Sequence, residues 1–166
     1  MALTLDNPFW RFSLAVYGAP GVQAECLALQ ERFGIDVNVL LFCAWIGVSK
    51  RISLDNAQLN AIEAATGSWH QAAVQPLRAA RQQLKAMPEM SHPDVVQLRK
   101  ELAALELRAE QIEQALLCEL ASQIPAGSTS APDAVRGNVD AYLRRRDEAI
   151  AVDQVAAQFL AAASQA

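Results

Sequence analysis

The sequence contains few of the residues from which catalytic and metal sites are usually built. Its 166 residues include only two histidines, His70 and His92, and three cysteines with no Cys-X-X-Cys pair. A zinc site needs three or four Cys, His or carboxylate ligands that converge, and a Ser-His-Asp or Cys-His site would need one of these histidines as its base. No Gly-X-Ser-X-Gly motif is present. The sequence therefore predicts no catalytic residue, no metal ligand and no cofactor.

Nucleotide and membrane signals are missing as well. Neither Gly-X-Gly-X-X-Gly nor Gly-X-X-X-X-Gly-Lys-Ser/Thr occurs, which excludes the common phosphate-binding loops. The longest apolar run, residues 39–48, is too short to cross a bilayer as a helix, and residues 1–6 do not resemble the start of a secretory signal. The three widely spaced cysteines fit small buried hydrophobes in a reducing compartment. These absences predict a cytoplasmic protein without membrane insertion.

The residues that are abundant predict a helical fold. Hydrophobic residues make up 52% of the chain although aromatic residues are only 6%, so a core is available and alanine supplies much of it. Strand signals are nearly missing, whereas typical helix starts and stops are frequent. They divide the chain into predicted helices at residues 9–17, 20–33, 37–47, 53–67, 69–87 and 93–124. The expected fold class is all-α, a compact multi-helix bundle.

The predicted helix 37–47, capped by Asp36, is apolar on every side. A helix without a polar face is usually surrounded by other helices, so we expect it at the centre of the fold. Ser53 is expected to cap the following helix, and Gly67 to end it. Pro76 is expected to kink or break helix 69–87 near Ala72, because proline removes one backbone hydrogen bond and clashes with the preceding turn.

The longest predicted helix, 93–124, carries a coiled-coil heptad seam over three repeats. Residues 50–85 have an excess of positive charge and residues 94–119 an excess of negative charge, so helices 69–87 and 93–124 are expected to form an antiparallel hairpin. Since helix 69–87 is the shorter, Ile112, Leu116 and Leu120 are left for another surface. We expect them to bind an unknown protein partner or a second copy of the chain in a homodimer.

The composition divides the chain into three parts. Residues 5–124 are predicted to form the helical bundle with its hairpin. Residues 125–132 are rich in Pro, Gly, Ser and Ala, which is typical of a linker. Residues 133–166 are predicted to form a weakly helical, alanine-rich tail of one or two marginal helices that fray at the end of the chain.

A basic stripe raises the possibility of nucleic-acid binding; its members are Lys50, Arg51, Arg78, Arg81 and Lys85. Such stripes bind phosphates because each neutralised phosphate releases counterions. This chain has a net charge of −4, and no aromatic residues alternate with the stripe to stack on bases. Salt bridges to the acidic helix 93–124 explain the stripe without a ligand, so nucleic acid is not an expected partner.

Asn38 is an amide placed one turn into the most apolar helix of the sequence. An unpaired amide there would be costly. Either it fixes the register of the helix through a buried hydrogen bond, or it faces a pocket. The predicted pocket would be lined by residues from separate segments, namely Trp10, Arg11, Asp36, Asn38, Trp45 and Trp69.

Two segments resemble a known family. They are FWRFSLAVYGAPGV at residues 9–22 and DVNVLLF at residues 36–42, supported by Cys26–Gln30, Trp69 and the Pro76-Leu77-Arg78 run. Together they resemble a family of small proteobacterial cytosolic proteins classed as a domain of unknown function, over about residues 5–120. The resemblance implies an α-helical bacterial protein and brings no catalytic residues. The stretch after Pro125 does not share the family pattern.

Three functional hypotheses follow from the sequence. The first is a non-enzymatic protein–protein interaction or regulatory adaptor module. It rests on the predicted helix 93–124, whose apolar heptad positions are more than the rest of the chain is expected to cover. The second is a small-molecule binder or metal-free enzyme with a pocket near Asn38 and Trp45. The third is a weak nucleic-acid or ribosome-associated factor acting through Arg78, Arg81 and Lys85.

Overall fold

The computed structural model describes residues 2–166, and within them the chain is α-helical with no strand. The predicted all-α fold class is confirmed. The α-helices are α1 (Pro8–Tyr17), α2 (Val22–Phe33), α3 (Val37–Lys50), α4 (Asn56–Trp69), α5 (Gln75–Lys85), α6 (Pro93–Leu120), α7 (Ala131–Arg144), α8 (Val152–Val155) and α9 (Ala157–Ala163). A π-helical turn, η1 (His70–Val74), joins α4 to α5, and 3₁₀ turns lie at η2 (Pro88–Ser91) and η3 (Ala121–Gln123).

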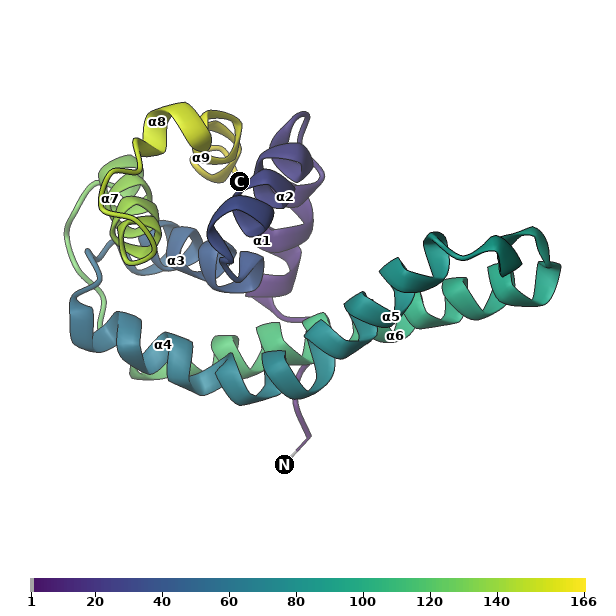
Figure 1. Ribbon diagram of the computed structural model, residues 1–166. Helices are drawn as coiled ribbons and strands as arrows, with labels where there is room; N and C mark the ends of the chain where they lie inside the picture. Colours follow the sequence, from purple (N-terminus) through teal and green to yellow (C-terminus); the bar gives the residue numbers. More distant parts are fainter. Residues whose placement is uncertain (1) are drawn as a thin grey trace.

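The molecule consists of a compact bundle and a projecting arm (Figure 1). The arm is made of α5, η2 and the first half of α6, and it extends away from the remaining helices. α5 runs antiparallel to α6 along the arm, and the second half of α6 continues under the bundle, where it contacts α4, α1 and α3.

The centre of the bundle is α3, nine of whose fourteen residues are buried. The N-cap residue of α3 is Asp36, whose carboxylate accepts a hydrogen bond from the Asn38 N–H at 2.8 Å. α7 packs along α3 more extensively than any other helix does, and α1, α6 and α9 cover further sides. The helix extends beyond the expected Gly47 to Lys50, because Gly47 is a packing position and not a cap. A Cβ atom added at Gly47 would lie 2.5 Å from the Val135 backbone nitrogen of α7.

Residues 133–166 contribute more to the core than the expected marginal tail would. Val135, Val139, Tyr142 and Leu143 of α7 have no exposed surface, and neither has Phe159 of α9. The first four lie at helical spacing on one face of α7. Residues 125–132 are also tied to the bundle, since the N–H of Gly127 donates to the carbonyl of Lys50 at 2.7 Å.

The helix boundaries between α4 and α5 differ from the expected ones for local reasons. α4 is capped by Asp55 and not by Ser53, because Asp55 and Gln58 form a reciprocal capping box. α4 also passes through Gly67 without ending there. The irregularity expected near Ala72 is η1, a π-helical turn directly before Pro76. A wider turn accommodates a residue that cannot complete the regular helical hydrogen-bond pattern.

No helix among residues 2–166 combines the length and the apolar character needed to span a membrane. The three cysteines are free thiols, with Cys26 and Cys43 buried and Cys118 half-buried.

The close approach of α3 and α7 predicts opposite effects for two glycine substitutions. Gly47→Ala forces its new methyl group into the α7 backbone, and we expect a loss of about 2 kcal/mol in the free energy of unfolding. Gly137→Ala, in α7, meets nothing within 4 Å and should stabilise by about 0.5–1 kcal/mol through helix propensity. Urea unfolding measures both. Equal effects at the two positions would contradict the packing of α7 on α3.

Candidate functional site

A buried polar network lies where the turn before α3 meets η1 and α6. We use this term for Asp36, Asn38, His70, Glu113 and Gln114. Three of the five, Asn38, Glu113 and Gln114, are buried, and Glu113 has no exposed surface. Groups of this kind need partners inside the protein, because burial without hydrogen bonds is costly.

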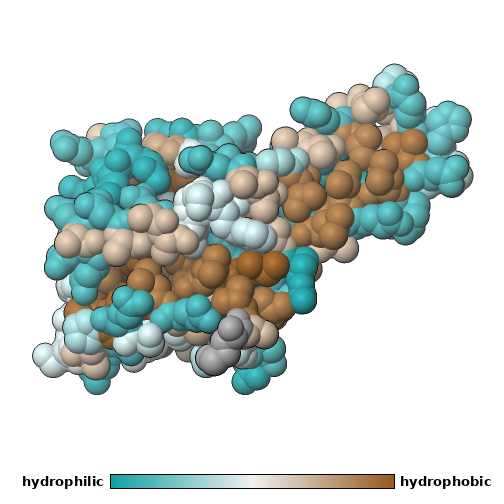
Figure 2. Space-filling view, turned by 90° about the horizontal axis from the view of Figure 1, so that it is seen from below, coloured by the Kyte–Doolittle hydropathy of each residue, from teal (hydrophilic) through white to brown (hydrophobic). Residues whose placement is uncertain are grey.

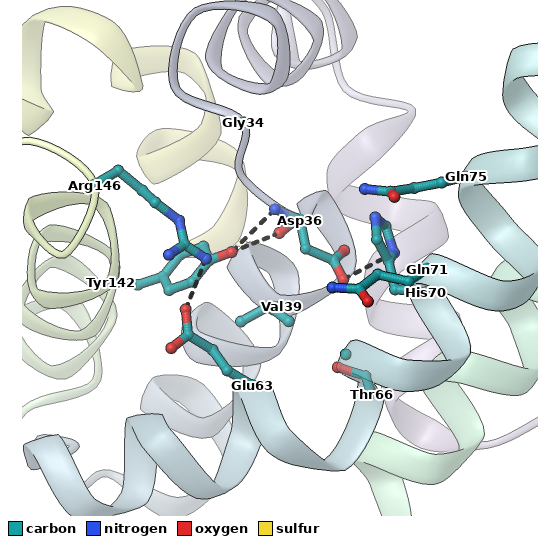
Figure 3. A pocket seen from close by; sticks show the side chains of 11 residues that line it. Gly34, Asp36, Val39, Glu63, Thr66, His70, Gln71, Gln75, Tyr142 and Arg146 are labelled. Carbon is teal, nitrogen blue, oxygen red and sulfur yellow. Dashed lines mark hydrogen bonds and ion pairs between the residues drawn. The ribbon is translucent and has the colours of Figure 1, made fainter.

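His70 joins the two carboxylates of the network. Its Nδ1 atom lies 3.0 Å from Asp36 Oδ2 and 3.0 Å from Glu113 Oε1. His70 is the first residue of η1, so the π-helical turn positions the ring beside α3 and α6. Figure 3 shows the ring directed toward the Asp36 carboxylate.

Asn38 also binds both carboxylates. Its Nδ2 donates to Glu113 Oε2 at 2.7 Å, and its backbone N–H donates to Asp36 Oδ1. Its Oδ1 accepts a hydrogen bond from Gln114 Nε2 at 2.8 Å. Asn38 therefore makes the buried hydrogen bonds expected of a register-fixing amide, and it also lies against a cavity described below.

Asp36 is held by α7 as well. Its backbone N–H donates to the Tyr142 hydroxyl at 3.0 Å, and that hydroxyl donates to the Asp36 carbonyl at 3.3 Å (Figure 3). Burial and the charge of Glu113 raise the pKa of Asp36 to about 7. For His70, burial lowers the pKa, but the hydrogen bond with Glu113 and the charge of Asp36 outweigh it, so that the pKa is raised.

A second set of charged side chains fixes the arm to the bundle. Arg78 Nε donates to Glu106 Oε1 at 2.9 Å, and its two terminal nitrogens donate to Gln30 of α2 and Glu110 of α6. Arg81 forms a further ion pair with Glu106. Hydrogen bonds from both arginines lower the pKa of Glu106, although burial alone would raise it.

Two cavities flank the polar network. The smaller, of about 180 Å³, is lined by Asp36 and His70 together with Thr66, Gln71 and Gln75 (Figure 3). The larger, of about 540 Å³, lies between α1, α2 and α3 on one side and the arm on the other. Asp36 lines both cavities.

The larger cavity has an apolar part and a cationic part. Its apolar lining residues are Trp10, Leu14, Tyr17, Leu27, Val37, Leu41, Ala103 and Leu107. Its cationic lining residues are Arg78, Arg81, Lys85 and Arg99. The ion pairs within residues 2–166 engage Arg78 and Arg81 but neither Lys85 nor Arg99.

Several polar atoms of this cavity lack partners. Four buried side-chain nitrogen or oxygen atoms have no hydrogen bond within the described part of the chain, and three of them are Ser13 Oγ, Gln114 Oε1 and Arg99 Nε. All three residues line the larger cavity. Since buried polar groups are nearly always hydrogen-bonded, this concentration marks the cavity as the place where the chain offers unused polar contacts.

Comparison with known proteins identifies a family over the same region. A sequence model of the family described as "Protein of unknown function (DUF2390)" matches residues 8–117. The chain belongs to this family. No curated protein and no solved structure matches the chain. The match to DUF2390 includes the whole polar network and the Arg78 ion pairs, whereas Tyr142 lies outside it.

The structure brings together half of the pocket residues expected from the sequence. Trp10, Asp36 and Asn38 line the larger cavity. The other three, Arg11, Trp45 and Trp69, do not. Each of these three side chains makes a different contact elsewhere in the fold.

Arg11 is exposed and pairs with Asp6. Trp45 packs in the core, with ring centroids 5.3 Å from Phe9 and 5.8 Å from Phe42. The Trp69 ring nitrogen donates to the Ala109 carbonyl at 2.9 Å. Trp45 and Trp69 thus serve packing and helix contact, the roles that large aromatic residues most often have.

The expected partner-binding residues Ile112, Leu116 and Leu120 are half-buried where α6 passes under the bundle. The large exposed apolar residues of α6 are instead on the arm, namely Leu98, Leu105 and Leu107. The basic stripe is also divided. Arg78, Arg81 and Lys85 line the larger cavity, whereas Lys50 and Arg51 lie at the end of α3, where their carbonyls accept hydrogen bonds from residues 127–129.

Sequence reasoning missed the contact of His70 with Glu113. From the sequence, His70 was considered only as the base of a catalytic site, and Glu113 was not singled out. The two residues are 43 positions apart, and no motif joins them. The one available signal was the kink at Pro76, because a π-helical turn often marks a functional position.

Removal of the buried Arg78 is expected to lower the free energy of unfolding more than removal of an exposed arginine. Arg78→Ala leaves Glu106 and Glu110 without their shared partner in a largely buried place, and we expect a loss of about 3 kcal/mol in the free energy of unfolding. Arg136→Ala removes the exposed pair with Asp153 and should cost no more than about 1 kcal/mol. Urea unfolding of both variants at low salt measures the difference, because urea is uncharged and does not screen the ion pairs. Similar losses would show that Arg78 is not buried as described.

Proposed function

We propose that this chain is a binding protein whose larger cavity holds a small molecule with an apolar body and an anionic group. The observation that carries the proposal is the set of unpartnered polar atoms on Ser13, Gln114 and Arg99, all three in residues that line one cavity. A volume of about 540 Å³ falls within the range of ligand pockets, which are mostly apolar with a few placed polar groups.

The charge of the ligand follows from the cationic side chains. Arg78 and Arg81 are neutralised by Glu106 and Glu110, but Arg99 and Lys85 are available. A carboxylate, sulfonate or phosphate group would complete their hydrogen bonds.

The apolar body of the ligand follows from the exposed apolar side chains that line the same cavity. Leu14, Leu27 and Leu107 are about half exposed and line the cavity together with Trp10. Contact with a ligand would remove part of this leucine surface from water, which is favourable in proportion to its area. No side chain of the cavity forms a nucleophile–base pair, so binding is supported here and a reaction is not.

The probe 1-anilinonaphthalene-8-sulfonate tests this function, because it carries an aromatic body and one anionic group and fluoresces in apolar surroundings. We expect saturable binding by the folded protein. Arg99→Glu should weaken it by about tenfold or more, since a lost charge-assisted hydrogen bond is worth over 1 kcal/mol. Fluorescence titration gives the affinities, and circular dichroism checks the fold.

Lys100→Glu is the matched control. Lys100 is the next residue along α6, is exposed, and is not part of the cavity lining. It makes the same change in charge and should leave the affinity within about twofold of the original, because exposed charges are screened by salt. If the two variants bind the probe equally well, the cavity is not its site.

A second candidate function is contact of the arm with another protein. Leu98 and Leu105 are exposed by 48% and 55% and lie seven residues apart on α6, so they share one face of the helix. Figure 2 shows a broad hydrophobic surface along the arm. An amphipathic helix of a partner protein fits such a surface, since helices bind grooves and helix pairs through anchors at this spacing.

Leu98→Glu with Leu105→Glu tests the arm. The double variant should abolish any partner captured by the tagged protein from its own cell lysate while leaving the affinity for the fluorescent probe unchanged. Arg136→Gln with Arg144→Gln is the control for the change in charge, because it alters the net charge by the same amount at two exposed positions away from the arm. Capture that survives the leucine changes would exclude this face as the contact.

A further inference from the structure

A set of three side chains beside the smaller cavity has the arrangement of a metal site. The ligand atoms of Asp36, His70 and Glu113 all lie within 4.8 Å of one another. The two distances from His70 Nδ1 are both 3.0 Å. Ligands held around Zn²⁺ at about 2.0–2.1 Å in a tetrahedral arrangement are about 3.3 Å apart, so the two distances from His70 Nδ1 are close to those of a zinc site.

The orientation of both carboxylates leaves one oxygen of each for the shared centre. Asp36 Oδ1 accepts from the Asn38 N–H, and Glu113 Oε2 accepts from Asn38 Nδ2. Asp36 Oδ2 and Glu113 Oε1 each lie 3.0 Å from His70 Nδ1, whereas Glu113 Oε2 is farther from it at 3.4 Å. Hydrogen bonds that hold the outer oxygens and present the inner ones are typical of the residues that surround metal ligands.

Two carboxylates share a single imidazole nitrogen in this cluster. His70 Nδ1 carries at most one hydrogen, yet two carboxylate oxygens lie at hydrogen-bond distance from it. One of them is on Glu113, whose side chain has no exposed surface. When His70 donates to Glu113 Oε1, Asp36 Oδ2 has no hydrogen from this ring, and a cation between the three atoms would interact favourably with both carboxylates.

The smaller cavity supplies an entrance and a fourth ligand position. It is lined by Asp36 and His70 and has a volume of about 180 Å³, which is enough for an ion with bound water. The side chains of Gln71 and Gln75 line the same cavity beside His70 (Figure 3), and their amide groups suit hydrogen bonds with such a water.

We propose that Asp36, His70 and Glu113 bind one divalent transition-metal ion of the Zn²⁺ type, with water in the fourth position toward the smaller cavity. One imidazole with two carboxylates favours Zn²⁺ over Mg²⁺, because imidazole is a poor ligand for Mg²⁺. The three ligands come from the turn before α3, from η1 and from α6, so the ion would hold three separate segments together. Of the three ligands, Asp36 also lines the larger cavity, whereas His70 and Glu113 do not.

Zinc binding to the full chain, freed of metal with a chelator, tests the proposal. We expect isothermal titration calorimetry to show one Zn²⁺ per chain and the melting temperature to rise with Zn²⁺ but not with Mg²⁺, since a ligand that binds the folded state stabilises it. Asp36→Asn and His70→Gln should each weaken Zn²⁺ binding at least tenfold. Asparagine at position 36 also caps helices well, so that variant keeps the cap of α3 and is expected to fold.

Two controls separate this site from other zinc ligands. His92→Gln changes the second histidine, which is exposed in the turn before α6, and should leave the affinity unchanged. Substitution with Co²⁺ should give a spectrum without thiolate charge-transfer bands, which excludes the three cysteines.

Absence of Zn²⁺ binding overturns the proposal, and so does binding that Asp36→Asn and His70→Gln leave intact. In either case a shared proton holds the cluster together. Arg99→Glu, which tests the larger cavity, should not alter Zn²⁺ binding, so the two proposals fail separately.

Discussion

The structure depends on a helix that has no side suited to water. α3 is buried over nine of its residues, and each of its faces must meet another part of the chain because exposing apolar surface is costly. α1, α6, α7 and α9 meet this requirement from separate positions in the sequence. The distance between the backbones of α3 and α7 also depends on the sequence of α3. Gly47 lets α7 approach so closely that a side chain at this position would clash with the α7 backbone. The order of the helices around α3 is therefore a consequence of its composition.

The buried polar network lies at the N-terminus of α3, where the helix has unpaired N–H groups that need hydrogen-bond partners. The first N–H groups of any helix lack partners inside it, and Asp36 satisfies one of them. A carboxylate placed there is buried by the same helices that cover α3, so it needs partners in turn. Asn38, His70 and the Tyr142 hydroxyl surround it. The network, with Asp36 in both cavity walls, follows from capping an apolar helix inside a bundle.

More of the fold than of the candidate site could be predicted from patterns among neighbouring residues. The absence of a polar face in residues 37–47 and the clash caused by Pro76 are properties of neighbouring residues, and each appears in the structure as a buried α3 and a π-helical η1. The importance of α7 was missed because alanine dilutes its apolar face, although Val135, Val139, Tyr142 and Leu143 lie at helical spacing. The pairing of Glu113 with His70 had no local signal, since it exists only once α6 passes under η1. Trp10, Asp36 and Asn38 were found because they flank the apolar helix, whereas Trp45 was misplaced because an aromatic residue in that helix packs inward.

The family match contains the residues of the candidate site but not all of the helices that bury α3. DUF2390 covers residues 8–117, which include every ligand atom of the Asp36–His70–Glu113 cluster and the whole lining of the larger cavity. The same residues do not cover α3, because α7 and α9 supply the remaining faces. Tyr142 joins the two parts by fixing both backbone groups of Asp36. A chain ending near residue 117 would keep the chemistry of the site but would expose the apolar face of α3 on which the position of Asp36 depends. The geometry of the network is thus determined jointly by the family region and by the helices that follow it.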